Sequence, residues 1–272
     1  MTHLLHAEQL TLGYDNKIIA RDLSVAIPAG KFSVIIGPNA CGKSTLLRAL
    51  CRLLKPMAGD VLLDGTSIHR IPTKTLARQL GLLPQHAIVP DNITVMDLVA
   101  RGRYPHQTLL RQWSDADQTA VEQAMAATNV SELAERSVDE LSGGQRQRVW
   151  IAMVLAQQTP LLLLDEPTTW LDIAHQIDLL DLFRELNQQH DRTLVAVLHD
   201  LNQACRYADH LIVMRAGAVM AQGVPADIIT AELVQEVFGM ACVIIDDPVS
   251  HTPLIVPCGR HHPAPWVSPP PP

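Results

Sequence analysis

The chain has 272 residues, of which 47% are hydrophobic and 18% charged, and this composition is typical of a globular protein rather than a disordered one. Its formal net charge of −7 argues against a nucleic-acid-binding protein, because such proteins normally present a basic surface. Five scattered cysteines without a C-x-x-C pair indicate reduced thiols rather than a disulfide or zinc framework. No run of 18 apolar residues and no secretion-signal pattern is present, so we expect membrane association to go through partner proteins.

The N-terminal part of the chain is predicted to form short strands separated by turns. We expect strands at residues 7–12 and 23–27 with a turn at 13–16 between them, and a hairpin edge at 61–65. A helix is expected at 74–79 with Thr73 as its N-cap, followed by a brief strand at 81–84 that ends near Gln85.

A glycine-rich turn lies between an apolar run, Val34 to Ile36, and a stretch of helical spacing, Ser44 to Leu54. Backbone N–H groups of such a turn point into a concavity at a helix N-terminus and bind phosphate. Lys43 is expected to reach the β- and γ-phosphates, and the Ser44 hydroxyl to hold Mg²⁺. The alternative, an accidental match, arises about once in a hundred chains of this size. The predicted phosphate loop is Gly37-Pro38-Asn39-Ala40-Cys41-Gly42-Lys43-Ser44-Thr45.

The middle of the chain is predicted to be a helical insertion within an α/β domain. Thr94 with Asp97 and Ser114 with Asp117 have the spacing of helix-capping boxes, and each pair opens a run of helical periodicity. A further helix is expected from Gly144 to about residue 158, so the helical part covers about 86–158.

The second half alternates buried strands with helices, which predicts a mainly parallel sheet with its ligand site at the carboxyl ends of the strands. Ile173, Ile177, Leu180 and Phe183 are expected to line one helix face. The proline-rich stretch 261–272 is expected to be disordered. Strands are predicted at 161–164, 194–198, 211–214, 218–221, 243–245 and 254–256.

Two carboxylates end the predicted strand at 161–164. Asp165 is expected to bind Mg²⁺, and Glu166 to polarise a water in line with the γ-phosphate. The alternative is that two acidic residues simply terminate a strand.

Leu141-Ser142-Gly143-Gly144-Gln145 opens the helix expected from Gly144 and forms a second anion-binding N-terminus. If the Ser-Gly-Gly sequence stood alone, an ordinary helix start with a serine N-cap would explain it. Followed here by Arg146-Gln147-Arg148, however, the stretch resembles the signature motif of ATP-binding-cassette (ABC) proteins. The resemblance implies that the signature of one subunit faces the phosphate loop of the other, with two ATP molecules between two identical chains.

Four further positions match this family one at a time. Tyr14 resembles the aromatic residue that stacks on adenine, and Gln85 the glutamine that touches Mg²⁺ and water. Asp172 resembles the aspartate at the dimer seam, and His199 the histidine that contacts the γ-phosphate. A packing role for Tyr14 and a structural role for His199 are the alternatives. Ala40 departs from the family, which most often has glycine there, but alanine costs little unless the residue needs a positive φ.

The resemblance implies a P-loop ABC-type nucleotide-binding domain of the α/β class. It has a mainly parallel core sheet, an N-terminal antiparallel β subdomain and a helical insertion that carries the signature. We expect this domain at 4–240 and a C-terminal β extension at 241–260.

Within the family, residues 100–107, 167–173 and 199–207 are similar to ATPase subunits of bacterial ferric-siderophore importers, and residues 244–248 and 252–257 to the ferric enterobactin branch. This implies ATP and Mg²⁺ as cofactors and a location on the cytoplasmic face of the bacterial inner membrane. The implied partners are a second copy of the chain, two membrane permease subunits and, indirectly, a periplasmic or lipid-anchored siderophore-binding protein, with no nucleic acid.

The permease is expected to dock on residues 94–104, with Arg103 in the contact, although a solvated helical flank is the alternative. Vitamin B12, haem or another metal chelate remain possible cargoes. Three other classes of ATPase or GTPase fit the sequence less well. A DNA-repair ATPase of the same superfamily would need sustained heptad repeats, and a translation factor would carry two cassettes in tandem, whereas this sequence has no such repeats and one cassette. A P-loop kinase or GTPase would lack the stretch 141–145.

Overall fold

A six-stranded sheet forms the centre of the computed structural model, which describes residues 5–15, 17–85, 92–108, 113–169 and 171–259. The strand order is β10-β9-β3-β8-β7-β6, and every neighbouring pair is parallel except β9 and β10. The predicted mainly parallel core is therefore confirmed. Its strands are β3 (Phe32–Ile36), β6 (Leu80–Leu83), β7 (Leu161–Asp165), β8 (Thr193–Val197), β9 (His210–Arg215) and β10 (Ala218–Gly223).

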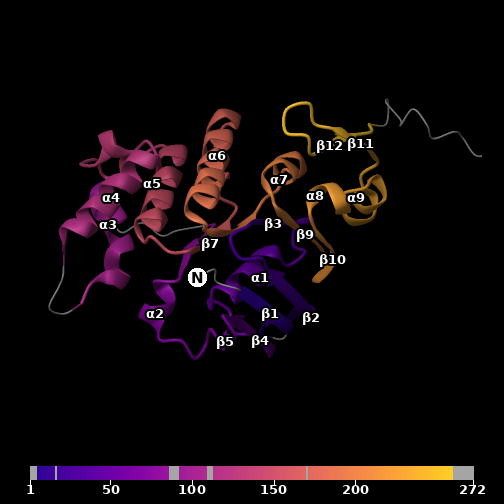
Figure 1. Ribbon diagram of the computed structural model, residues 1–272, viewed down its shortest axis with the longest axis horizontal. Coiled ribbons are helices and arrows are strands. Elements are labelled where there is room, and N and C mark those ends of the chain that lie inside the picture. Colours follow the sequence, from indigo (N-terminus) through magenta and orange to yellow (C-terminus); the bar gives the residue numbers. More distant parts are fainter. Residues whose placement is uncertain (1–4, 16, 86–91, 109–112, 170, 260–272) are drawn as a thin grey trace, which may run out of the picture.

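A second, antiparallel sheet of order β2-β1-β4-β5 comes from the N-terminal part of the chain and confirms the predicted β subdomain. Figure 1 shows it beside the central sheet, with α1 (Lys43–Leu50) nearby. Tyr14 and Lys17 pair across the hairpin turn, so Tyr14 belongs to the end of a strand. The strands are β1 (Leu5–Tyr14), β2 (Lys17–Ile27), β4 (Ala58–Leu63) and β5 (Thr66–Ser67).

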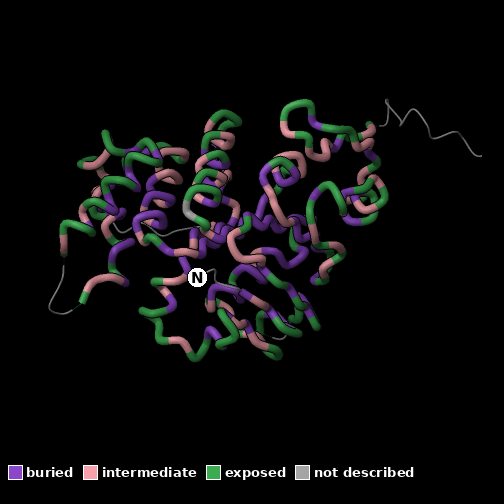
Figure 2. Tube along the Cα trace, viewed as in Figure 1, coloured by how far each residue is buried: buried purple, intermediate pink, exposed green. Residues whose placement is uncertain are grey.

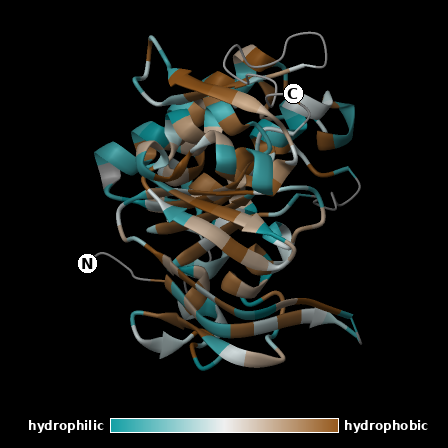
Figure 3. Cartoon of the chain, turned by 90° about the vertical axis from the view of Figure 1, so that its right-hand side faces the viewer, coloured by the Kyte–Doolittle hydropathy of each residue, from teal (hydrophilic) through white to brown (hydrophobic). Residues whose placement is uncertain are grey.

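The central strands read as continuous apolar runs because both faces of their sheet are covered. Val34 and Ile36 face a core shared with the helices, whereas Ile35 faces a core shared with the antiparallel sheet and α1. Figures 2 and 3 show the same arrangement as buried, hydrophobic strands inside more exposed and polar outer segments.

The helical part packs on the first of these cores. Thr94 and Ser114 cap their helices as predicted, because each side chain accepts a hydrogen bond from the backbone N–H three residues on. The elements are α3 (Val95–Ala100), α4 (Asp115–Ala127), α5 (Gly143–Ala156) and the 3₁₀ turns η1 (Arg101–His106), η2 (Ser131–Leu133) and η3 (Val138–Glu140). The short helix α2 (Thr73–Ala77) precedes the helical part and packs on the second core through Leu76.

The C-terminal half adds helices around β8 to β10 and ends in a separate two-stranded hairpin. Among the helices that the structure describes, none has both the length and the hydropathy that a membrane span requires. The proline-rich stretch 261–272 lies outside the described residues. The elements are α6 (Ile173–His190), α7 (Leu201–Tyr207), α8 (Pro225–Ile228), α9 (Ala231–Phe238), β11 (Cys242–Asp246) and β12 (Pro253–Pro257).

Three local predictions were wrong. The helix expected to reach Leu54 ends at Leu50, because Arg52 adopts a left-handed φ of 65° that turns the chain toward β4. Pro72, not Thr73, is the N-cap of α2, and the Thr73 hydroxyl instead accepts a hydrogen bond from Arg52. Ile173 is 73% exposed, because the first turn of α6 projects beyond the core that buries Leu180.

Candidate functional site: a phosphate loop and a three-residue cluster

The phosphate loop joins β3 to α1, as the sequence predicts. Gly37 has a φ of 156°, and a Cβ there would collide with the backbone carbonyl oxygen of Met214 on β9. Gly42, the N-cap of α1, has a φ of 109° and no side chain to occupy the first N–H groups of the helix. Both glycines therefore keep the loop close to the sheet and its backbone donors available to an anion.

Ala40 has a φ of 61°, so the position does need the left-handed conformation that glycine adopts most easily. The alanine is exposed and has room for its Cβ. Its cost is therefore backbone strain rather than a steric clash.

Lys43 lies over the loop with only 5% of its surface exposed. Its ammonium donates hydrogen bonds to the carbonyl oxygens of Gly37, at 2.8 Å, and Pro38, at 3.0 Å. The positive charge is thus held within the loop whose N–H groups favour phosphate.

Asp165 ends β7 and is almost completely buried. Burial raises the pKa of its carboxyl above the usual range, the hydrogen bond from Ser44 opposes that shift, and the charge of Glu166 adds to it. The Ser44 hydroxyl donates to Asp165 Oδ1 at 3.0 Å. A hydroxyl and a carboxylate side by side beneath the phosphate loop are oxygen ligands that suit Mg²⁺.

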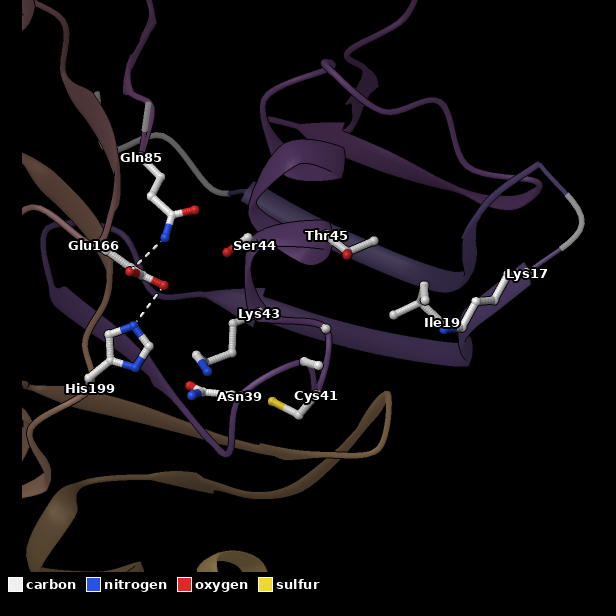
Figure 4. A pocket seen from close by; sticks show the side chains of 12 residues that line it. Lys17, Ile19, Asn39, Cys41, Lys43, Ser44, Thr45, Gln85, Glu166 and His199 are labelled. Atoms are coloured by element: carbon white, nitrogen blue, oxygen red, sulfur yellow. Dashed lines mark hydrogen bonds and ion pairs between the residues drawn. The ribbon is translucent and has the colours of Figure 1, made fainter. Parts of the chain in front are cut away.

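Glu166, Gln85 and His199 form a cluster at the carboxyl ends of the neighbouring strands β7, β6 and β8. Gln85 Nε2 donates to Glu166 Oε2 at 2.8 Å, and His199 Nε2 lies 2.7 Å from Glu166 Oε1. Figure 4 shows the amide and the imidazole approaching the carboxylate from two sides. Glu166 has a φ of 53°, a strained backbone of the kind that occurs at functional sites.

This cluster and the phosphate loop enclose one cavity of about 550 Å³. Two of its residues, Lys17 and Ile19, were missed by sequence reasoning and lie on β2 at the far end of the cavity from Glu166 (Figure 4). The one sequence signal for these two residues was their position just after the predicted turn at 13–16. Tyr14 is 40% exposed, has its hydroxyl 3.4 Å from Arg48, and is not among the described residues that line this cavity. The lining is Lys17, Ile19, Asn39, Ala40, Cys41, Gly42, Lys43, Ser44, Thr45, Gln85, Glu166 and His199.

The signature stretch lies elsewhere. Ser142 is the N-cap of α5 and forms a capping box with Gln145, in which each side chain bonds the backbone of the other residue. Gly143 is the first residue of α5. A separate cavity of about 280 Å³ is lined by Ser142, Gly144, Gln145, Arg148, Leu171, Asp172 and His175.

Asp172 reaches this second cavity from the start of α6, where it accepts hydrogen bonds from the backbone N–H and the ring of His175. These bonds lower the pKa of the Asp172 carboxyl. Gln147 of α5 donates to the Pro167 carbonyl oxygen at 3.0 Å and so connects the signature helix to the loop after Glu166. Most of the predicted site residues therefore line, or lie next to residues that line, one of two cavities of the chain, whereas Tyr14 lines neither.

Arg103 does not fit its expected place in a docking surface. It is 5% exposed, pairs with Asp117 at 2.8 Å, and donates to the Ala156 carbonyl oxygen at 2.7 Å and to Gln158 at 3.0 Å. It connects η1, α4 and the end of α5 inside the helical part, because a buried guanidinium charge needs several acceptors. The expectation that Arg103 contacts a permease was wrong.

The comparisons with known proteins agree with this geometry. The family model described as ABC transporter matches residues 20–169. The chain is 60% identical over 260 residues, covering 96% of both chains, to the ferric enterobactin transport ATP-binding protein FepC of Escherichia coli (strain K12). It is 55% identical to the achromobactin transport ATP-binding protein CbrD of Dickeya dadantii (strain 3937), covering 94% of this chain and 96% of that one.

Solved structures with the same fold include a dimeric bacterial ABC transporter cassette, MJ0796. It has a TM-score of 0.73 and 26% identity, and the match covers 81% of this chain and 98% of that one. The same cassette is known in a post-hydrolysis state bound to ADP and Pi, with a TM-score of 0.72. The chain therefore belongs to the ABC transporter family and is an ATP-binding, ATP-hydrolysing subunit of the kind that works as a dimer with membrane permeases.

Proposed function

We propose that the chain hydrolyses ATP for an importer of ferric siderophores of the enterobactin type. The convergence of Gln85 and His199 on Glu166, all three in the lining of the phosphate-loop cavity, carries the catalytic part of the proposal. The cargo rests on relatives named for siderophore transport, of which the enterobactin protein is 60% identical to this chain.

In this proposal the loop from Gly37 to Thr45 binds the phosphates of ATP through its backbone N–H groups. Lys43 exchanges its loop carbonyl acceptors for β- and γ-phosphate oxygens, and Tyr14 stacks on the adenine. Lys17 and Ile19 lie at the end of the cavity away from the cluster and contact the nucleoside.

Ser44, Asp165 and Gln85 would hold Mg²⁺ with hydroxyl, carboxylate and amide oxygens. When bound, the ion neutralises charge that develops between the β- and γ-phosphates.

Glu166 accepts a proton from the attacking water. Because Gln85 and His199 each contact a different oxygen of the carboxylate, they fix its orientation toward the water. About half of the His199 side chain is exposed, which supports its proposed contact with the γ-phosphate of a bound ATP.

The second cavity supports a homodimer. Ser142 and Asp172 line it together, and the described residues that line the first cavity include none from 141–145. In the proposal Ser142, Gly143, Gly144 and Gln145 of one chain therefore complete the nucleotide site of its partner. The dimer binds two permease subunits on the cytoplasmic face of the inner membrane, and a siderophore-binding protein delivers the cargo from outside.

The proposal also keeps the predicted domain bounds. These are 4–240 for the ATPase domain, with its helical part at about 86–158, and 241–260 for the C-terminal extension.

The catalytic part is tested with Glu166→Gln, which keeps the hydrogen-bonding shape but removes the base. We expect kcat for ATP to fall by about 10²-fold or more while ATP binding persists and an ATP-bound dimer accumulates. Glu185→Gln, an exposed carboxylate on α6, is the matched control and keeps normal turnover. Normal turnover in Glu166→Gln would remove Glu166 from its role.

The cargo is tested by deleting this subunit and supplying iron from one source at a time. We expect growth on ferric enterobactin to be lost and to return with the intact subunit but not with Glu166→Gln. A 41% identical cobalamin import protein of Halobacterium salinarum makes vitamin B12 the alternative cargo. Unchanged growth on ferric enterobactin, together with lost vitamin B12 uptake, would favour that alternative.

A further inference from the structure

The C-terminal hairpin β11–β12 is fixed to α7, the short helix that follows His199. Asn202 on α7 uses both ends of its amide: Nδ2 donates to the Ile255 carbonyl oxygen at 3.2 Å, and Oδ1 accepts from the Ile255 N–H at 2.8 Å. Figure 1 shows α7 between α6 and this hairpin. A two-point bond to backbone fixes the direction of the strand relative to the helix as well as its distance.

A second bond joins the other end of α7 to the hairpin. Arg206 lies 2.6 Å from Asp247, a carboxylate that is only 4% exposed. Asp247 also accepts from the N–H groups of Val249 and Ser250, so the turn of the hairpin holds it in place. The bond from Arg206, with these N–H donors, holds the pKa of Asp247 well below its usual range, and the pair is charged at neutral pH.

The hairpin joins the hydrophobic core only in part. Ile255 and Cys242 belong to the core and Ile244 packs against it, whereas Val249 is 78% exposed and Ile245 is 47% exposed. The polar bonds to α7 therefore add orientation to a limited apolar contact.

His199 lies directly before α7 in the chain. His199 is followed directly by Asp200, the N-cap of α7, whose side chain accepts from the Gln203 N–H. Within the described residues, the imidazole of His199 has one ionic partner, Glu166, so its placement depends on the backbone between β8 and α7.

The opposite side of α7 is tied to α6. Gln203 donates to Gln176 at 3.2 Å, and the Tyr207 hydroxyl donates to Asp181 at 2.7 Å. The helix is thus held between α6 and the hairpin, and a shift of the hairpin would move it against α6.

We propose that the β11–β12 hairpin positions His199 against Glu166 through α7, with Asn202, Arg206 and Asp247 as positioning residues. The inference rests on the proposed role of His199 in ATP hydrolysis. The hairpin then acts on turnover without lining the nucleotide cavity, whose described lining residues all come from before residue 200.

The test is the double variant Asn202→Leu/Arg206→Met in the full-length chain. It removes both bonds by replacing the two polar side chains with apolar ones of similar size. We expect kcat for ATP to fall by about tenfold, because misplacing a reacting group by a fraction of an ångström is costly, while KM for ATP changes by less than about twofold. In a His199→Ala background the same double variant should cause no further loss, because both changes act through one residue. Arg206→Lys, which keeps the charge, should restore most of the turnover.

His251→Ala is the matched control, because His251 lies in the same hairpin and pairs only with the exposed Asp246 among its described neighbours. It should leave kcat unchanged. If thermal unfolding shows that the double variant is not folded, the single variant Arg206→Met decides the question with the same measurements.

An unchanged kcat in the folded variant overturns the inference, as does an equal loss with and without His199. If His199→Ala alone keeps full turnover, the proposed role of His199 fails first, and the inference fails with it. If His199→Ala is inactive and the hairpin variants are fully active, only the hairpin's role fails.

Discussion

The two cavities of this chain both begin at helix N-termini, yet they are chemically unequal. At the first, the N-cap of α1 is Gly42, which has no side chain, so the first backbone donors of the helix remain available to a ligand. At the second, Ser142 and Gln145 cap α5 for each other, and Asp172 caps α6. The first cavity can therefore bind an anion by itself. At the second, side-chain caps already occupy some of the N-terminal N–H groups of α5 and α6.

The polar side chains proposed for catalysis divide in the same way. Glu166, Gln85 and His199 all line the first cavity, and the second contains Asp172 paired with His175 at its rim. In the proposed dimer the first cavity holds the catalytic side chains and the second completes the partner's nucleotide site, which would give a two-chain arrangement its physical reason. The following predictions, four substitutions and one pH dependence, test this division, from the largest expected effect to the smallest.

Lys43→Ala should weaken anion binding in the first cavity by removing the ammonium that the phosphate loop holds. Hydrogen bonds to charged groups are worth about 1.5–3 kcal/mol each, so we expect ATP affinity to fall by about 10²-fold. Nucleotide titration of the purified chain measures this. A loss smaller than about threefold would mean that the loop backbone alone binds the phosphates. Lys31→Ala, an exposed lysine outside both cavities, is the control.

Arg103→Glu should damage the half of the molecule that carries the second cavity. It places a carboxylate beside the buried Asp117, and breaking such a pair costs about 3–5 kcal/mol, which denaturant unfolding measures. Arg101→Glu, on the same turn but exposed, should change stability by less than about 0.5 kcal/mol. Equal stability of the two variants would contradict the buried role.

The same pair gives the native chain a pH dependence of known sign. Burial opposes ionisation of Asp117, but the hydrogen bonds from Ser114 and Arg103 prevail and lower its pKa. The folded-state value is below the unfolded one, so the contribution is present at neutral pH and is lost as the pH falls below about 4.

Ser142→Ala should separate the roles of the two cavities. Losing the N-cap costs about 1 kcal/mol, which lowers the unfolding temperature by a few degrees. ATP binding at the phosphate loop of a single chain should stay within about twofold, whereas turnover of the dimer should fall by about tenfold. Thr230→Ala removes a similar cap from α9, distant from both cavities, and should lower stability without lowering turnover. Equal turnover in the two variants would argue against a role for Ser142 in the partner's site.

Ala40→Gly should have the smallest effect. The left-handed φ of 61° strains alanine, and glycine would relieve that strain at the cost of a more flexible unfolded chain, so the two terms nearly cancel. The loop keeps its N–H group, and we expect ATP affinity to change by less than about threefold. A change of tenfold or more in a titration would show that the strain itself shapes the phosphate site.

The sequence by itself determined the elements whose signals are local. The apolar runs of the central strands, the capping residues Thr94, Ser114 and Ser142, and the glycines of the phosphate loop each depend on near neighbours, and all of these lie where expected. The candidate cluster residues could also be named: Glu166 from its place at the end of a buried strand, and Gln85 and His199 from the family resemblance.

Only the tertiary structure decided which candidates meet. It brings Gln85 and His199, which are 114 positions apart (199 − 85), onto one carboxylate, and it separates Ser142 and Asp172 from them into a second cavity. It also buries Arg103 and exposes Ile173, because burial depends on which segments distant in sequence cover a side chain, and no local periodicity specifies that.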